Sequence, residues 1–295
     1  MRAVALDHEG QPALADVPEP TAPGQLVHVR ACGLCGSDVE KIGEHPGTAP
    51  AGTVLGHEVE GVLDNGTRVT VAHRVACGSC ERCRAGHGST CEGFREVRIA
   101  PGGFAERLRA SHVVPLPDLV GELDGIWVEP LACIVRAAPL VPEGRVAVVG
   151  CGAVGLLWAQ LLLRRGCEVV AVEPRPERRA GAVALGASED DDPVDAAVLT
   201  APAGVGEALR RLSPGGTLLV FAAPAGELAF SLDAVYRKEL SVVGSRSALL
   251  SDFDAAIAQL PSLQLPPTVE LPLERFSEGL ELYRSGRAAK VVFVP

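Results

Sequence analysis

The segment RVAVVGCGAVGLLWAQLLLRRGCEVVAVE, residues 145–173, decides the fold of the C-terminal half of this sequence. A short β-branched run is followed by the glycine-rich turn GCGAVG, by a leucine-rich stretch and by a second apolar run that ends at Glu173. This order predicts a strand, a tight turn, a helix over 153–165 and a second strand. A glycine-rich turn in this context, with an acidic residue closing the next strand, is typical of a dinucleotide-binding βαβ unit.

The turn also predicts how a dinucleotide would be held. Its glycines let backbone N–H groups approach a pyrophosphate at the positive end of a helix. We therefore expect cofactor contacts from Gly150, Gly152, Ala153, Val154 and Gly155. Glu173 is expected to accept hydrogen bonds from the adenosine ribose and to repel the extra phosphate of NADP, which favours NAD. Arg175, Arg178 and Arg179 could instead clamp that phosphate, so NADP remains the alternative.

The apolar runs, cysteine content and net charge of the chain indicate which broad class of protein it belongs to. Residues 146–163 are 18 positions without a charge, but glycines divide them, so we interpret them as strand, turn and helix rather than as a membrane span. The N-terminus holds no apolar run typical of a signal peptide, so we expect a cytoplasmic protein whose nine cysteines are thiols or metal ligands. A net charge of −10 argues against a general binder of nucleic acid or anionic membranes.

The sequence contains two regions with different residue patterns. Residues 1–120 are rich in Gly and Pro and contain short alternating segments such as TRVTVAHRV, which predicts a β-rich domain with irregular loops. From Arg145 onward, apolar strands alternate with amphipathic helices, a pattern typical of βαβ units on a parallel sheet. The sequence is therefore predicted to form an α/β protein with two domains.

Four cysteines lie close together in CGSCERCRAGHGSTC, residues 77–91. The spacing C-x2-C-x2-C-x7-C of Cys77, Cys80, Cys83 and Cys91 favours a tetrahedral zinc held by four thiolates. An iron–sulfur cluster is the main alternative, and a redox C-x-x-C pair would use two cysteines rather than four. A zinc with four protein ligands has no open position, so we expect this metal to be structural.

A second set of potential ligands lies upstream, in CGLCGSD (32–38) and GHE (56–58). Cys35, His57 and Glu58 offer three ligands that leave one position open, as a catalytic zinc requires. Ser37 would place a hydroxyl near the metal, and Asp38 could hold the other ring nitrogen of His57.

These motifs, followed by VEPLAC and VVGCGAVG, occur in the order seen in the zinc-dependent medium-chain dehydrogenase/reductase family, and the resemblance covers nearly the whole chain. It implies a GroES-like, β-rich catalytic domain over residues 1–138 and 264–295, with the structural zinc lobe at 77–91. It also implies a shortened Rossmann domain over residues 139–263, two zinc ions per chain and a homodimer or homotetramer.

The resemblance also assigns roles to residues. Cys35 and His57 match ligands of the catalytic zinc, Glu58 matches a ligand or close neighbour, and Ser37 heads a proton relay. Glu129 stands where alcohol dehydrogenases of the family carry a cysteine ligand. A glutamate at this position resembles the polyol branch of the family, which includes sorbitol and threonine dehydrogenases. There the glutamate holds the zinc-bound water or enters the coordination shell, so Glu129 joins the candidate ligands and catalytic residues.

The implied reaction is the reversible oxidation of a secondary alcohol, such as a polyol, sugar or cyclitol, with hydride transfer to NAD. Glu40, His45 and His73 are candidates for relay or substrate contacts, and Cys133 is interpreted as a buried apolar cysteine. Two alternatives remain: a zinc-dependent aldehyde or ketone reductase using NADPH, and a non-catalytic nucleotide-binding protein that holds only the structural zinc.

Three segments are shorter than the family pattern implies. GEHPGTAP (43–50) is a brief link before His57, and residues 246–267 are compact. GASEDDDPVDAAV (186–198) leaves little room for the third strand and helix of the nucleotide-binding sheet. We expect the last change to remove part of the adenosine side of the cofactor site.

Overall fold

The computed structural model describes residues 1–42, 49–222 and 229–295, and it divides into two compact units. The first unit comprises Met1–Ala132, Ala248–Ser262 and Pro267–Pro295, and the second comprises Cys133–Ser247 and Leu263–Pro266. The expected domain boundaries put residues 248–262 with the nucleotide-binding domain, whereas the structure places them in the first unit. There, Leu249 packs directly against Gly88 of the segment 77–91.

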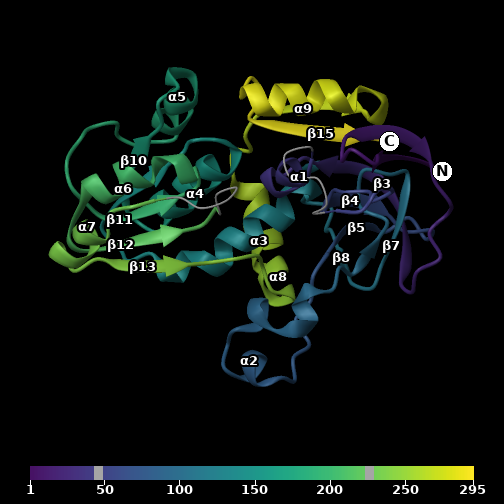
Figure 1. Cartoon of the computed structure of the whole chain (residues 1–295), viewed down its shortest axis with the longest axis horizontal. Helices are drawn as coiled ribbons and strands as arrows, with labels where there is room; N and C mark the ends of the chain where they lie inside the picture. The colour runs from purple at the N-terminus through teal and green to yellow at the C-terminus, as the bar shows by residue number, and fades with distance from the viewer. Residues whose placement is uncertain (43–48, 223–228) are drawn as a thin grey trace. The chain divides into compact units, whose positions relative to one another are not determined.

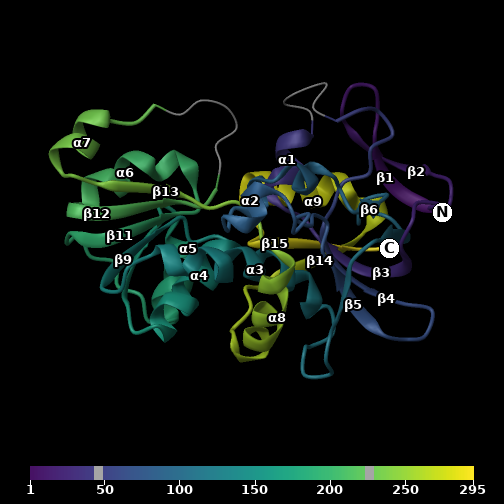
Figure 2. The same ribbon diagram turned by 90° about the horizontal axis from the view of Figure 1, so that it is seen from below.

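The first unit is rich in β-strands, as the alternating segments predict, and its strands pair in antiparallel fashion except for the parallel pair of β14 and β15. Its main sheet has the order β14-β15-β3-β4-β5-β8, with β7 pairing both β3 and β6, and a separate ribbon pairs β1 with β2 (Figure 2). The strands are β1 (Arg2–Leu6), β2 (Pro12–Asp16), β3 (Gln25–Gly33), β4 (Glu58–Val62), β5 (Arg68–Val71), β6 (Ile99–Ala100), β7 (Arg107–Ala110), β8 (Val113–Pro115), β14 (Thr268–Pro272) and β15 (Lys290–Val294).

The helices of this unit are α1 (Gly36–Lys41), α2 (Glu81–Arg84), α8 (Leu250–Gln259), α9 (Phe276–Ser285) and the start of α3 (Val128–Ala137). Helix α9 lies along β15 (Figure 1), where the Phe276 and Phe293 rings stack at a centroid distance of 4.4 Å. Phe104 meets both rings edge-on. A Cβ at Gly279 would lie 2.5 Å from the Phe293 ring, so glycine is what allows this close packing.

The second unit contains a five-stranded parallel sheet in the order β10-β9-β11-β12-β13 (Figure 1). The strands are β9 (Arg145–Val149), β10 (Glu168–Val172), β11 (Val194–Leu199), β12 (Leu212–Val220) and β13 (Ser241–Gly244). The helices are α4 (Ala153–Arg164), α5 (Pro176–Ala184), α6 (Val205–Arg211) and α7 (Leu232–Arg237). The predicted strand, turn and helix over 145–165 are thus confirmed.

The expected loss of the third strand is also confirmed. Strand β10 is the edge of the sheet, and beyond it the described residues form only an isolated bridge between Val170 and Ser188. The chain then passes through an acidic run, Glu189–Asp192, and enters β11 directly. A strand–helix unit is replaced by a short charged connection.

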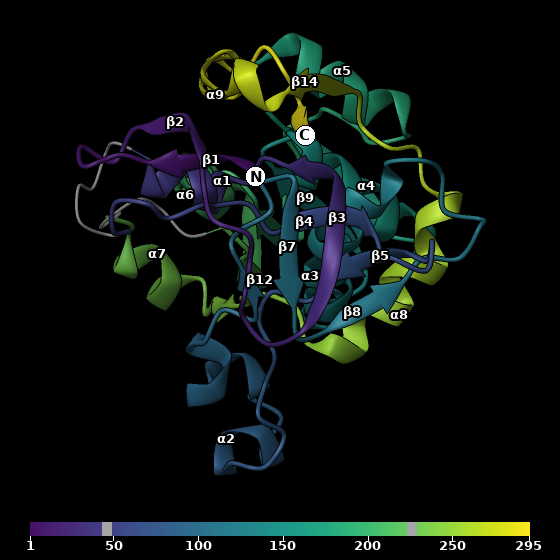
Figure 3. The same cartoon turned by 90° about the vertical axis from the view of Figure 1, so that its right-hand side faces the viewer.

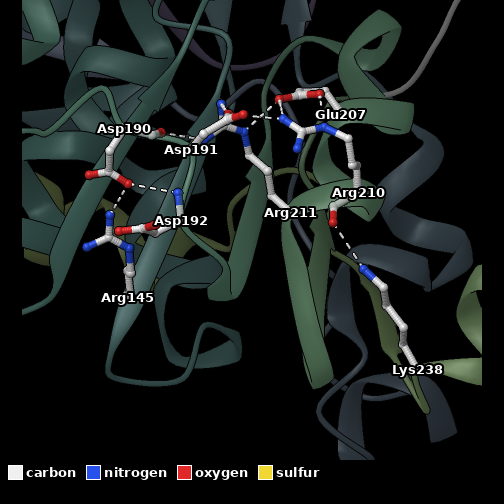
Figure 4. Close-up of polar contacts among 8 residues, drawn as sticks. All are labelled: Arg145, Asp190, Asp191, Asp192, Glu207, Arg210, Arg211 and Lys238. Atoms are coloured by element: carbon white, nitrogen blue, oxygen red, sulfur yellow. Dashed lines mark hydrogen bonds and ion pairs between the residues drawn. The ribbon is translucent and has the colours of Figure 1, made fainter.

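Ion pairs hold this acidic run against the sheet (Figure 4). Asp190 pairs with Arg145 at the start of β9, and Asp191 pairs with Arg210 and Arg211 at the end of α6. Glu207 accepts hydrogen bonds from both of those arginines at 2.6 Å. The guanidinium of Arg145 lowers the pKa of Asp190, and the Arg210 hydrogen bond lowers the pKa of Glu207 to about 2.

Candidate active site and metal centres

The glycine-rich turn between β9 and α4 has backbone geometry that other residues would not tolerate. Gly150 has φ +98° and donates its N–H to the Val172 carbonyl at 2.8 Å. A Cβ at Gly155 would lie 1.9 Å from the Gly150 oxygen, so the helix could not pack this close to the turn with any side chain there. Gly152 is the N-cap of α4, with a half-buried Val154 and a buried Ala153 in the first turn.

Glu173 lies beside this turn at the end of β10. Its buried carboxylate accepts the Cys151 N–H at 3.0 Å and the Arg175 N–H at 3.1 Å. Burial, reinforced by the Glu173 charge, raises the pKa of the Cys151 thiol to about 12. Arg175 is exposed, whereas the Arg179 guanidinium is bound to the Glu173 carbonyl and to Glu189.

The cysteine lobe, residues 77–91, brings all four sulfurs within 4.8 Å of one another. The Cys77 and Cys83 sulfurs are 3.8 Å apart, and those of Cys80 and Cys83 are 3.5 Å apart. Four sulfurs about 2.3 Å from one tetrahedral zinc would be separated by roughly 3.8 Å, so the set fits a zinc ion. Figure 3 shows the lobe, marked by α2, set apart from the strands of its unit.

A buried carboxylate, Asp38, organises the second ligand set. Its Oδ1 lies 3.4 Å from Nδ1 of His57, as the sequence predicted, and its oxygens accept the N–H groups of Cys35 and Gly56 at 3.2 Å each. Ser37 donates its hydroxyl to the Cys35 sulfur at 3.5 Å. Burial works to lower the pKa of His57, but the charges of Asp38 and Cys35 outweigh it and raise the pKa well above its ordinary value.

His57 also belongs to a group of three residues, His57, His73 and Glu129, whose ligand atoms all lie within 4.8 Å of one another. The two histidine rings have centroids 4.5 Å apart. His73 Nδ1 lies 3.8 Å from Glu129 Oε1. Burial, together with the charge of His57, holds the pKa of His73 well below its ordinary value. We call these three residues the His57 group.

Glu58 is engaged elsewhere. Its buried carboxylate forms a short ion pair with Lys290, whose Nζ also donates to the Leu34 carbonyl at 3.3 Å and lies 5.4 Å from the centre of the Trp127 ring. Glu58 is the first residue of β4 and follows His57 directly. Because successive side chains along an extended chain point to opposite sides, Glu58 points away from His57. The structure therefore does not bring Glu58 into the His57 group.

The other residues that the sequence suggested for the site lie as follows. Glu40 is exposed on α1, and His45 lies outside the described residues. Cys133 is half-buried and, within the described part of the chain, belongs to neither set of metal-binding side chains. The sequence predicts His73 only as a relay or substrate contact, whereas the structure places it in the His57 group through the pairing of β4 with β5.

Both halves of the chain match known protein families. The family model of the alcohol dehydrogenase GroES-like domain matches residues 23–118, and that of zinc-binding dehydrogenases matches residues 153–262. D-altritol 5-dehydrogenase of Agrobacterium fabrum is 30% identical, covering 92% of this chain and 94% of its own length. Sorbitol dehydrogenase of Halalkalibacterium halodurans is 28% identical, covering 97% and 96%.

Solved structures give the same result. Alcohol dehydrogenase TADH from Thermus sp. ATN1 matches with a TM-score of 0.83 at 27% identity over 100% of both chains. Acetophenone reductase from Geotrichum candidum, in complex with NAD, has a TM-score of 0.87 at 21% identity, covers 100% of this chain and 97% of its own, and shares the fold.

The chain belongs to the zinc-binding dehydrogenases of the medium-chain alcohol dehydrogenase family. The predicted family, its polyol-dehydrogenase-like branch and the predicted combination of a GroES-like with a Rossmann-type domain are confirmed. Within the residues that the structure describes, no helix is both long enough and apolar enough to cross a membrane.

Proposed function

We propose that this protein is a zinc-dependent oxidoreductase that transfers hydride between NAD(H) and a secondary alcohol or its ketone, with a polyol, sugar or cyclitol as substrate. The observation that carries the proposal is the His57 group, gathered beside Cys35 in a unit that also holds a separate four-sulfur site. The relatives named D-altritol 5-dehydrogenase, L-galactonate-5-dehydrogenase and sorbitol dehydrogenase support the substrate class.

Two zinc ions per chain are part of this proposal. The four sulfurs of the cysteine lobe would hold the structural ion. Cys35, His57 and Glu129 would hold the catalytic ion, while Glu58, bound to Lys290, would remain a close neighbour. Zinc(II) at this position would supply a Lewis acid for the substrate oxygen, and NAD would supply the hydride acceptor.

The side chains of the site have distinct tasks in this proposal. Asp38 fixes the ring of His57 through Nδ1, which leaves Nε2 to face the metal position. Asp38 also holds the Cys35 and Gly56 backbones, so one carboxylate sets the distance between two ligand-bearing segments. Ser37, whose hydroxyl already reaches the Cys35 sulfur, accepts the proton of the substrate alcohol at Oγ and passes its own hydroxyl proton outward.

The surroundings of Glu173 support NAD over NADP. Its two backbone hydrogen bonds fix the carboxylate beside the glycine turn, and a carboxylate has further acceptor positions for ribose hydroxyls. Arg179 is occupied by Glu189 and the Glu173 carbonyl, which leaves it poorly placed to bind an extra phosphate. We therefore propose contacts from Gly150, Gly152, Ala153, Val154, Gly155, Glu173 and Arg175 to NAD.

Replacing Glu173 by Ala is expected to shift the cofactor preference toward NADP, because it removes both the ribose acceptor and the charge that repels the phosphate. Steady-state kcat/KM with each cofactor measures the shift, with Glu177→Ala on the exposed first turn of α5 as the control. An unchanged ratio in the Glu173 variant would contradict this role.

We also propose a homodimer in which β13 pairs with its counterpart in a second copy. Strand β13 is the edge of the parallel sheet, and the side chain of Val242 on it is 43% exposed. An unprotected edge offers a row of unpaired backbone groups for such pairing. Light scattering of the wild type and of Val242→Lys, which adds charge to the edge, tests the pairing.

The zinc content of the purified protein tests the proposed function most directly. We expect about two zinc ions per chain in the wild type and about one in Cys35→Ser, with the loss of polyol-dependent NADH formation. Cys133→Ser, outside both ligand sets, is the matched control and should keep two ions. One ion that is insensitive to Cys35→Ser would instead favour a nucleotide-binding protein with only the structural zinc.

A further inference from the structure

The register of two strands places His73 opposite His57. Strands β4 and β5 pair in antiparallel fashion, with Glu60 beside Thr70 and Gly61 beside Val69. Extending this register past the strand ends aligns residue 57 with residue 73, and their rings do meet, at a centroid distance of 4.5 Å. The proximity therefore follows from the sheet itself rather than from a chance loop conformation.

The ligand atoms of the His57 group lie within a few tenths of an ångström to about 1.4 Å of the separations expected on one metal ion. Ligand atoms about 2.1 Å from a tetrahedral zinc lie roughly 3.4 Å apart. His73 Nδ1 and Glu129 Oε1 are 3.8 Å apart, and the ligand atoms of all three residues fall within 4.8 Å of one another. Side-chain adjustments of less than 1 Å would bring this pair to the ideal separation.

The His57 group contains the imidazole of His73 and does not contain the carboxylate of Glu58. Glu58, the third ligand that the sequence suggested, is buried in an ion pair with Lys290. Withdrawing it toward the metal would leave that ammonium group buried without its counterion, which is strongly unfavourable. His73 requires no such break, because its Nδ1 already faces Glu129.

We propose that His73 is a direct ligand of the catalytic zinc, in the place that Glu58 would otherwise fill. The inference rests on the proposed function and deepens it, because it assigns a ligand to the same metal site. Cys35, His57 and His73 would then be the three permanent ligands, and Glu129 would hold the fourth position until a substrate oxygen replaces it, so the site stays open to substrate. The rival role for His73 is to orient Glu129 by a hydrogen bond without touching the metal.

Zinc and cobalt(II) are the probes that separate these roles. We would measure zinc affinity by competition with a chromophoric chelator, for the wild type, His73→Ala and His73→Cys. We would then record the absorption of cobalt(II) exchanged into the weaker of the two sites. The exposed His8 supplies the matched control, His8→Ala.

We expect His73→Ala to weaken zinc binding at one site more than 100-fold and to change the cobalt(II) spectrum, while His8→Ala leaves both unchanged. His73→Cys is expected to restore binding and to intensify the thiolate-to-cobalt charge-transfer absorption, because a sulfur has entered the coordination shell. Should His73→Ala fold poorly, the stronger charge-transfer absorption of His73→Cys still tests whether residue 73 binds the metal.

The inference is overturned if the cobalt(II) spectra of His73→Ala and His73→Cys match that of the wild type, whatever the loss of affinity, since His73 would then only orient Glu129. A failure of the proposed function looks different. In that case the wild type itself holds one zinc ion, and Cys35→Ser changes nothing.

Discussion

The cysteine lobe and the His57 group both gather metal-binding side chains, but from very different distances along the chain. The lobe takes four sulfurs from the fifteen positions of residues 77–91. The His57 group takes its members from before β4, after β5 and the first turn of α3. Spacing alone specifies the first site, whereas the second depends on strand register and on which buried charges are already paired.

The largest effect should follow from breaking the lobe. In Cys80→Ser the remaining three sulfurs cannot close a four-ligand site, and the lobe buries little apolar surface of its own. Since zinc binding supplies on the order of 10 kcal/mol to small metal-dependent folds, we expect loss of one zinc ion and proteolytic cleavage within the lobe. Limited proteolysis with zinc analysis measures both, with Cys133→Ser as the control. A variant that keeps its zinc and resists protease would show that the lobe is not held by metal.

The next largest effect concerns Lys290, which decides where Glu58 points. Lys290→Met leaves a buried carboxylate without its counterion, and we expect a loss of about 3–5 kcal/mol of unfolding free energy in urea titrations. Adding Glu58→Gln removes the unpaired charge, so the double variant should regain most of that stability. If the single variant loses less than ~1 kcal/mol, Glu58 has another partner when Lys290 is absent.

The Glu58 pair also marks the limit of what the sequence specified. The four-cysteine spacing and the glycine turn are local patterns, and both lead to the observed arrangements. The GHE motif is equally local, yet the direction of Glu58 is set by Lys290, more than 200 positions away. His73 follows from the β4–β5 register, which becomes available only once the pairing of the two strands is known.

A smaller effect is expected at Asp38, which contacts both His57 and the backbone of Cys35 in the candidate catalytic site. Asp38→Asn keeps the shape but removes the charge that holds His57 and weakens the clamp on the Cys35 segment. Loss of such a supporting carboxylate costs 10–100-fold in metal affinity in other zinc proteins, so we expect about that loss at the catalytic site and none at the lobe. The control is Asp64→Asn, an exposed partner of His28. Equal zinc affinity in both variants would mean that the register alone positions His57.

In the second unit, too, one feature follows from local sequence and another depends on residues far apart in the chain, although no metal site is involved. The absence of a third strand could be predicted, because residues 186–198 are too few to form it. The partners of the acidic run could not, because Arg145, Arg210 and Arg211 come from two separate elements. A run of aspartates in the sequence indicates only a solvated segment, and the sheet supplies the cations that fix it in place.

The smallest effect should be the pH dependence of this ion network. Arg210 lowers the pKa of Glu207 to about 2, so its stabilising contribution is complete above the unfolded pKa, near 4.5, and is lost as pH falls toward 2. Because these groups are largely exposed to solvent, each pair contributes little to stability and weakens in high salt. Wild type and Glu207→Gln should therefore differ in thermal midpoint at pH 6 in low salt and converge as the solution is acidified. A difference that stays constant with pH would mean that Glu207 acts through its packing in α6 rather than through its charge.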